Sequence, residues 1–122
     1  MSIRGIRGAT TVEVDQPEAV LSATQGLLHA ILQANPVLQT DDIASVFFTV
    51  TEDIVSVHPA QAARMMGWVA VPMICAMEIP VPGSLPRCIR VLVHWNTDLD
   101  QKLIRHVYLN NAVVLRPDIA NS

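Results

Sequence analysis

Two charged residues stand inside apolar runs of the sequence. Glu78 lies within the run 73–79 and is the only acidic residue between Asp53 and Asp98, and Arg90 interrupts the run 88–93. Burying an unpaired charge is costly, so a buried carboxylate must be paired or must shift its pKa. We therefore expect an arginine as the partner of Glu78. The alternative is that residue 78 lies at a sheet edge and faces water.

The alternation of side chains along a strand decides which way Arg90 points. One face of a strand over 87–96 would be apolar and would carry Ile89, Val91, Val93 and Trp95. The other face would carry Cys88, Arg90, Leu92 and His94, so we predict that Arg90 points away from the core. Arg4 and Arg7 differ by three positions, so only one of them can point into a given pocket.

Other catalytic groups have no supporting motif in this sequence. The four histidines, at positions 29, 58, 94 and 106, lack metal-ligand spacing and do not cluster with cysteines or carboxylates. Neither cysteine has a histidine beside it, and serine-nucleophile and phosphate-loop motifs are absent. We predict no metal and no cofactor. Seven of the eight basic residues are arginine, so arginines and one carboxylate could surround a small anion, for electrostatic catalysis or for binding alone.

The segments that must position these residues alternate between extended and helical patterns. Threonine, valine and isoleucine predict a strand over 2–14, with Gly5 and Gly8 where something approaches its backbone closely. Apolar residues at helical spacing predict a helix that opens with Asp15 and Glu18 and stops near residues 35–36. The other predicted elements are a strand at 43–51, a short helix at 60–66, central strands at 71–81 and 87–96, a helical turn at 98–103 and a strand at 105–109.

These elements predict an α+β fold in a single domain over residues 1–122. The expected architecture is a mixed five-stranded sheet covered by helices on one face, with a loosely held tail at about 110–122. Hydrophobic residues make up 51% of the chain, and the 16% of charged residues is below the roughly 25% of an average domain. We interpret the excess apolar surface as a subunit interface.

Charge, hydropathy and cysteine content argue against several partners. The net charge is −3 at pH 7 and no basic cluster is present, so we expect no nucleic acid. No apolar run reaches the roughly 18 residues of a membrane span, and residues 1–11 lack the apolar core of a secretion signal. Cys75 and Cys88 match neither a disulfide scaffold nor a metal motif. We therefore predict a cytoplasmic protein with reduced thiols and no membrane association.

Long segments in matching order and spacing resemble one family, the AroH class of monofunctional chorismate mutases. They are residues 3–12 (IRGIRGATTV), 88–91 (CIRV), and 104–109 followed by 112–118 (IRHVYL and AVVLRPD). The resemblance implies a homotrimer whose sheets pack into a pseudo-α/β barrel, with active sites in the clefts between subunits. It also implies an isomerase without a cofactor, which rearranges chorismate to prephenate in the shikimate pathway toward phenylalanine and tyrosine.

The resemblance further implies roles for the residues at matching positions. Arg90 would donate to the ether oxygen and a carboxylate, Arg7 would bind a substrate carboxylate and Glu78 would accept from the ring hydroxyl, which makes these three the catalytic residues. Tyr108 would donate to a carboxylate, and Cys75 would approach the same region as Glu78. Further substrate contacts are implied for the pocket wall, formed by Ile74, Cys75, Ala76, Met77 and Glu78, and for the rim, formed by Arg64 and Arg116.

Two positions near the expected site entrance depart from the family pattern. His58 stands where phenylalanine is common, and Gln61 stands where lysine is common. The segment from Arg64 to Gly67 is also one residue shorter. Two other functions stay open at this stage: a trimeric imine-hydrolysing protein of the reactive-intermediate deaminase type, and a non-enzymatic module that binds an aromatic acid. Conversion of chorismate to prephenate would separate a mutase from both.

Overall fold

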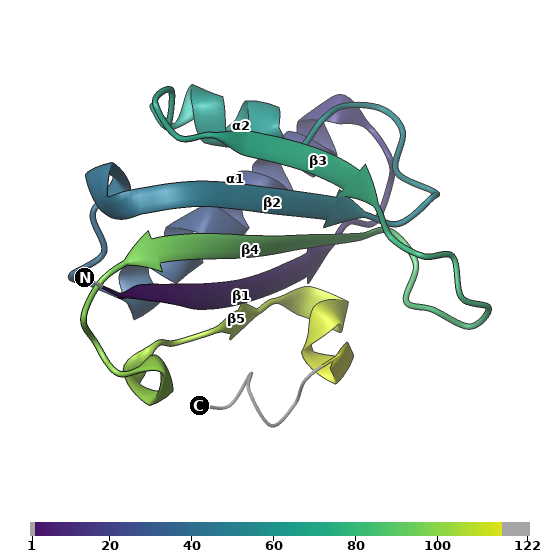
Figure 1. The fold of residues 1–122 in the computed structure, drawn as a ribbon. Helices are drawn as coiled ribbons and strands as arrows, with labels where there is room; N and C mark the ends of the chain where they lie inside the picture. The colour runs from purple at the N-terminus through teal and green to yellow at the C-terminus, as the bar shows by residue number, and fades with distance from the viewer. Residues whose placement is uncertain (1, 116–122) are drawn as a thin grey trace.

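Within residues 2–115, which this computed structural model describes, five strands form one mixed sheet with two helices over one face (Figure 1). The strands are β1 (Ile3–Thr11), β2 (Ile43–Val50), β3 (Met73–Met77), β4 (Cys88–Asn96) and β5 (Val107–Tyr108), in the spatial order β3-β2-β4-β1-β5. The helices are α1 (Pro17–Ala34) and α2 (Ala60–Met65), and 3₁₀ helices span Thr40–Asp42 (η1), Gln101–Leu103 (η2) and Asn110–Leu115 (η3). The predicted fold class and element order are confirmed.

β4 lies at the centre of the sheet as predicted, but β3 does not. β4 pairs antiparallel with both β1 and β2, whereas β3 pairs only with β2, in parallel, and forms an edge of the sheet within the described residues. The Glu78 N–H still donates to the Val50 carbonyl at 2.8 Å. Pro80 and Pro82 then lack the N–H groups that a longer ladder requires, so the predicted strand over 71–81 ends early.

α1 packs closely against β1 at one glycine. A Cβ atom at Gly8 would lie 2.9 Å from Ile31 Cδ1 and 3.2 Å from Leu27 Cδ1, so the absence of a side chain lets the helix approach the strand. A Cβ atom at Gly5 would make only an ordinary contact, 3.5 Å from Leu92 Cδ1. The predicted close approach is therefore confirmed at Gly8 and is wrong at Gly5.

The predicted capping of α1 by Asp15 is wrong. The helix is preceded by Gln16, which makes no side-chain capping bond. The Asp15 carboxylate instead accepts from the backbone N–H groups of Val55 (3.0 Å) and Ser56 (3.3 Å), in the segment between β2 and α2. The Val55 N–H contributes most, and the Ser56 side chain next, to lowering the pKa of this carboxyl. Asp15 therefore ties the start of α1 to the segment that leads into α2.

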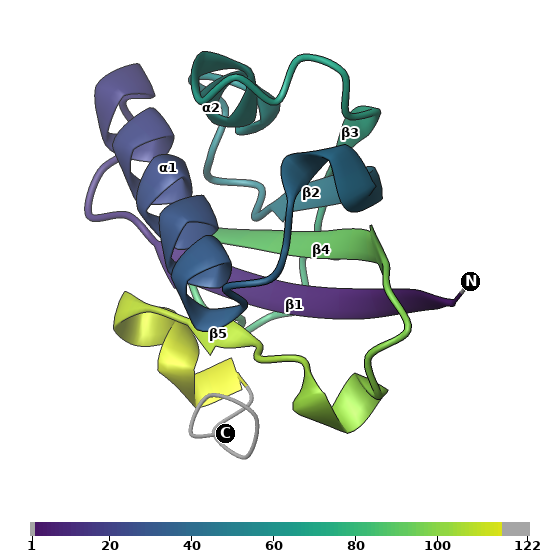
Figure 2. The same ribbon diagram turned by 90° about the vertical axis from the view of Figure 1, so that its left-hand side faces the viewer.

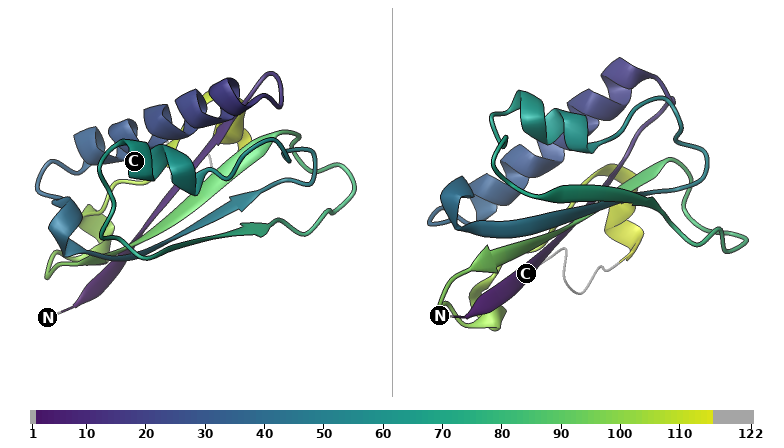
Figure 3. Two further views of the ribbon diagram at one scale, coloured as in Figure 1. Left: turned by 90° about the horizontal axis from the view of Figure 1, so that it is seen from above. Right: turned by 45° about the horizontal axis from the view of Figure 1, so that its top comes forward.

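The two sheet faces differ in what covers them. α1 and α2 lie on the same face, and no helix of residues 2–115 crosses the opposite face, which we call the open face (Figures 2 and 3). The predicted alternation in β4 is confirmed, because the apolar residues Ile89, Val91, Val93 and Trp95 are buried toward the helices. Arg90, Leu92 and His94 alternate with them and are half-buried on the open face. His94 Nδ1 lies 3.1 Å from Ser45 Oγ, and the His94 ring packs against the Phe47 ring in a T-shaped arrangement.

Side chains complete the edge of β1 where β5 has not yet begun. Gln101 pairs with both backbone groups of Gly5: its Oε1 accepts from the N–H at 3.1 Å and its Nε2 donates to the carbonyl at 2.8 Å. Two residues on, the Arg7 N–H donates to His106 Nδ1 at 2.9 Å. β5 then takes over the pairing from Gly8 onward, in parallel. We call this set of side-chain partners the side-chain edge of β1.

The C-terminal segment is partly packed. η3 follows β5, and its Ala112 is fully buried against β1 and the start of β4. Residues 110–115 therefore do not form the loose tail that we predicted, and residues 116–122, including Arg116, lie outside the described part of the chain. No helix within residues 2–115 is long and apolar enough to cross a membrane.

Candidate active site

Strand register places one row of side chains across the open face. β4 residue Arg90 pairs with Ala9 of β1 and Thr49 of β2, Ala9 pairs with Tyr108 of β5, and Thr49 pairs with Ala76 of β3. Because paired residues point to the same side of a sheet, residues from all five strands meet in this row. Ala9 has the smallest chiral side chain, so it leaves space between Arg90 and Tyr108. The row brings together residues up to 99 positions apart, from Ala9 to Tyr108.

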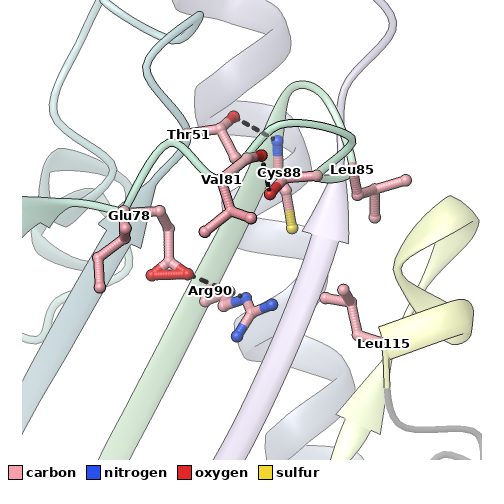
Figure 4. Close-up of a pocket in the computed structure, with 9 residues that line it drawn as sticks. Thr51, Glu78, Val81, Leu85, Cys88, Arg90 and Leu115 are labelled. Carbon is pink, nitrogen blue, oxygen red and sulfur yellow. Dashed lines mark hydrogen bonds and ion pairs between the residues drawn. The ribbon is translucent and has the colours of Figure 1, made fainter.

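Glu78 is paired with an arginine, as predicted, and that arginine is Arg90. Arg90 Nε lies 3.3 Å from Glu78 Oε1, and the side chains retain 38% and 26% of their exposure (Figure 4). Glu78 follows directly after the edge strand β3. Both expectations for Glu78 therefore hold in part: it lies at a sheet edge, and it has an arginine as its partner. With one Glu78 oxygen engaged at Arg90 Nε, the terminal nitrogens of the guanidinium remain available to a ligand.

Cys88 lies beside this pair as a neutral thiol. It is buried, and burial raises the pKa of the thiol, although the positive charge of Arg90 acts in the opposite direction. Cys75 is half-buried, and both cysteines are free. Since Cys88 does not ionise near neutral pH, it adds no negative charge that would compete with an anionic ligand for Arg90.

A hydrogen-bonded corner fixes the start of β4 and hence the place of Arg90. Arg87 has a left-handed backbone with φ 46°, and its N–H donates to both Asp53 carboxylate oxygens at 3.1 and 3.0 Å. Thr51 Oγ1 accepts from the Cys88 N–H at 2.9 Å and donates to Asp53. These bonds stabilise a backbone conformation that is unfavourable for a residue with a side chain. Nothing in the sequence pattern around Asp53 had indicated this role.

Two cavities adjoin Arg90 on the open face. One, of about 310 Å³, is lined by residues of the β3–β4 loop, by Glu78 and by Leu115 (Figure 4), and the other, of about 240 Å³, is lined by Arg7, Thr49 and Tyr108 among others. The Arg7 guanidinium has no ion-pair or hydrogen-bond partner within residues 2–115. Arg4, by contrast, turns away and donates to the Leu99 carbonyl at 2.7 Å.

Two buried hydroxyl groups of the second cavity also lack partners. Thr49 Oγ1 and Tyr108 Oη are inaccessible to water and make no hydrogen bond within the described residues. A buried polar atom without a partner is unfavourable by about 1–3 kcal/mol, so such atoms mark places where a ligand or another chain supplies the partner. Tyr108 was predicted as a site residue from the sequence, whereas Thr49 was not, because it is marked only by its place in an apolar strand.

The other predicted site residues line neither of the two cavities at Arg90. Cys75, Ala76 and Met77 line a separate depression with His58, and this depression shares no lining residue with the two cavities at Arg90. Cys75 and Glu78 therefore line different cavities of one chain, and whether they contact one substrate remains a prediction. Ile74 is exposed and lines none of these cavities, and Arg64 is exposed on α2.

The geometry of this site defines a class of protein. It is a small α+β domain with two arginines, one carboxylate and two unpartnered hydroxyls fixed on the open face of a sheet, an arrangement suited to a small anion with polar groups. Within residues 2–115 no group of three or more histidine, cysteine or acidic residues could hold a metal ion. Fixed donors of this kind act on charge that develops in a transition state, without a covalent intermediate.

Comparison with known proteins then identifies the family. The family model for chorismate mutase type I matches residues 3–119. A chorismate mutase AroH of Thermus thermophilus is 56% identical over 120 residues, which covers 98% of each chain, and that of Bacillus subtilis is 46% identical over 121 residues, which covers 98% of this chain and 94% of the relative. A solved chorismate mutase from Clostridium thermocellum superposes with a TM-score of 0.87 at 51% identity, covering 90% of this chain and 97% of that one. The chain belongs to the chorismate mutase type I family.

The resemblance found in the sequence is thereby confirmed. The activity is that of a chorismate mutase, an isomerase, and the match over nearly the full chain decides against the imine-hydrolysing and binding-only alternatives. The predicted homotrimer and the roles of individual site residues remain predictions.

Proposed function

We propose that this chain rearranges chorismate to prephenate by electrostatic stabilisation of the transition state, with Arg90 as the central catalytic residue. The observation that carries the proposal is the placement of Arg90, held by Glu78 at 3.3 Å, between two cavities on the open face. In this rearrangement the ether C–O bond breaks while a C–C bond forms, and negative charge grows on the ether oxygen. A fixed guanidinium is therefore more favourable to the transition state than to the substrate.

The neighbouring groups suit the two carboxylates and the ring hydroxyl of chorismate. Arg7 would bind one carboxylate, since its guanidinium has no partner within residues 2–115, and Tyr108 would donate its phenolic proton to a carboxylate. Glu78 would accept from the ring hydroxyl through the oxygen that does not face Arg90. In this proposal the protein supplies fixed charges and hydrogen bonds, and no proton leaves the substrate.

We also propose that the complete site lies between subunits of a homotrimer. The residues proposed to contact the substrate form two groups on one chain, one around Arg90 and one in the depression lined by Cys75, Ala76 and Met77. Contact between the first group of one chain and the second group of the next would unite them. The open face carries exposed apolar side chains such as Phe47 and Ile74, which an adjoining subunit would cover. Arg64 on α2 would then reach the rim of the neighbour's site.

Subunit mixing tests this arrangement. Arg90→Ala and Arg64→Ala chains would be unfolded together, refolded as a mixture and assayed by the ultraviolet absorbance of chorismate. In random trimers about a quarter of the interfaces would unite an intact Arg90 with an intact Arg64, so activity should rise well above that of either variant alone. Light scattering should give three times the mass of one chain. A monomer with full activity, or a mixture no better than its components, would contradict the shared site.

We place the enzyme in the cytoplasm. Both cysteines are free, which suits a reducing compartment, and the named relatives are bacterial enzymes. Fractionation of the source cells with an antibody against the chain would test this placement, and recovery outside the cytoplasmic fraction would contradict it.

A further inference from the structure

The backbone of Arg7 is held by a side chain. Its N–H donates to His106 Nδ1 at 2.9 Å, in a part-buried position. Because an N–H group carries a single hydrogen, this hydrogen is not used in the ladder between β1 and β4. β5 begins its own pairing with β1 only at Gly8↔Val107, so at Arg7 the imidazole takes the place that a strand carbonyl would occupy. The place of the Arg7 backbone on this side of β1 therefore depends on the side chain of His106.

The hydrogen bond also fixes the state of the imidazole. Nδ1 can accept from an N–H only when it carries no proton, so the neutral ring has its proton on Nε2. A ring with both nitrogens protonated would place an Nδ1–H against the Arg7 N–H. The bond therefore selects one tautomer and one ring orientation, and it links Arg7 to the element that presents Tyr108, two residues after His106.

We propose that His106 is a positioning residue for Arg7. This inference rests on the proposed function, in which the Arg7 guanidinium binds a substrate carboxylate. That guanidinium has no partner of its own within residues 2–115, so its location before substrate arrives is set by its backbone and by packing. His106 would hold Arg7 and Tyr108 at a constant separation, and both would meet the same anionic substrate. A shift in the Arg7 backbone would misplace one carboxylate relative to Arg90.

Two substitutions of similar polarity separate the bond from the bulk of the ring. In His106→Asn the side-chain carbonyl oxygen can occupy the position of Nδ1 and accept from Arg7, whereas His106→Gln extends its amide to the position of Nε2 and leaves the N–H without that acceptor. We expect His106→Gln to lower kcat/KM by about tenfold, mainly through KM, since misplacement by about 1 Å can cost up to about 10²-fold. His106→Asn should recover most of this loss.

A double-mutant cycle shows whether His106 acts through Arg7. If it does, His106→Gln should have little further effect on kcat/KM when Arg7 is already alanine. Gln101→Ala is the matched control, because it removes the neighbouring side-chain partner of β1, at Gly5, without touching Arg7. That control should lower stability and leave KM unchanged. Equal losses in kcat/KM from His106→Gln in the wild-type and Arg7→Ala backgrounds would overturn the proposal.

NMR measures the bond directly and separates failure of this inference from failure of the proposed function. The Arg7 amide proton should be protected from exchange in the wild type and in His106→Asn and should exchange faster in His106→Gln. The ¹⁵N shift of His106 Nδ1 should be that of an unprotonated ring nitrogen. An unprotected Arg7 amide in the wild type would overturn the positioning role, whatever the kinetics. A normal KM and kcat in Arg7→Ala would instead contradict the proposed role of Arg7 in binding substrate.

Discussion

Replacing Arg90 by alanine should separate catalysis from folding. In the folded chain Arg90 has one ion pair, with Glu78 at 3.3 Å, and both side chains are partly exposed at 38% and 26%. Pairs of this exposure contribute about 0–1 kcal/mol to stability, so unfolding should change by no more than about 1 kcal/mol. Because Arg90 is paired, its removal should not stabilise the chain, since the substitution leaves Glu78 without its partner.

The effect on turnover should be much larger than the effect on stability. Removal of one preorganised donor to a developing oxyanion costs about 10² to 10³ in kcat, or about 2.7–4 kcal/mol. Arg90→Lys keeps the positive charge but replaces the planar fork by a compact ammonium group, so it should recover only part of this loss.

The measurement requires three readouts on the same samples. Chorismate consumption gives kcat and KM, thermal or urea unfolding gives stability, and light scattering gives the oligomeric mass. Turnover by Arg90→Ala within a few-fold of the wild type would refute the central role of this residue. Loss of folding, rather than of turnover, would show that Arg90 is structural.

Substitutions at three further positions test individual contacts. Gly8→Ala should destabilise the fold by about 1–3 kcal/mol in urea unfolding, because its Cβ would lie 2.9 Å from Ile31 Cδ1; an unchanged midpoint would contradict this packing. Thr49→Val should stabilise the unliganded chain, because it removes a buried hydroxyl that has no partner, and it should raise KM, whereas Thr49→Ser should keep KM normal. A lower KM in the valine variant would count against a ligand at this hydroxyl. Asp15→Asn should lower the melting temperature at neutral pH. The bond to the Val55 N–H holds the folded-state pKa of Asp15 below its ordinary 3.8, so this stabilisation is present above pH 3.8 and is lost as the pH falls through the lower folded-state pKa. The melting temperatures of the wild type and the variant should therefore converge in acid. A difference that persists in acid would contradict the ionic origin of the stabilisation.

The alternation of side chains along a strand was the most reliable basis for predicting the fold and the site from the sequence. It placed Arg90 opposite the buried face of β4, and it separated Arg7 from Arg4, because both inferences need only the two-residue period of a strand. It could not place β3, because an apolar run has the same composition whether it is central or forms an edge. Pro80 and Pro82 were the residues in the sequence that could have indicated where β3 ends.

Contacts between distant side chains and backbone could not be predicted from sequence. Asp15 has the residue type and position of a helix cap, but it bonds to backbone 40 residues away, and Asp53 holds Arg87 across 34 residues. Thr49 is inconspicuous in its own strand and becomes a site residue only through the register with β4. Each of these depends on which segments the fold brings together, and a single sequence carries no direct record of such pairs.

The side-chain edge of β1 also decides how this sheet can meet another. A long strand with free N–H and C=O groups is a template for pairing with a second chain, yet the amide of Gln101 and the imidazole of His106 already occupy these groups at Gly5 and Arg7. At the opposite edge, β3 has a strand on only one side within the described residues. Within residues 2–115 a second chain could therefore pair with the outer edge of β3, whereas β1 offers it no free backbone group at Gly5 and no free N–H at Arg7. Contact between subunits through the open face, as proposed for the homotrimer, would not depend on strand pairing at either of these places.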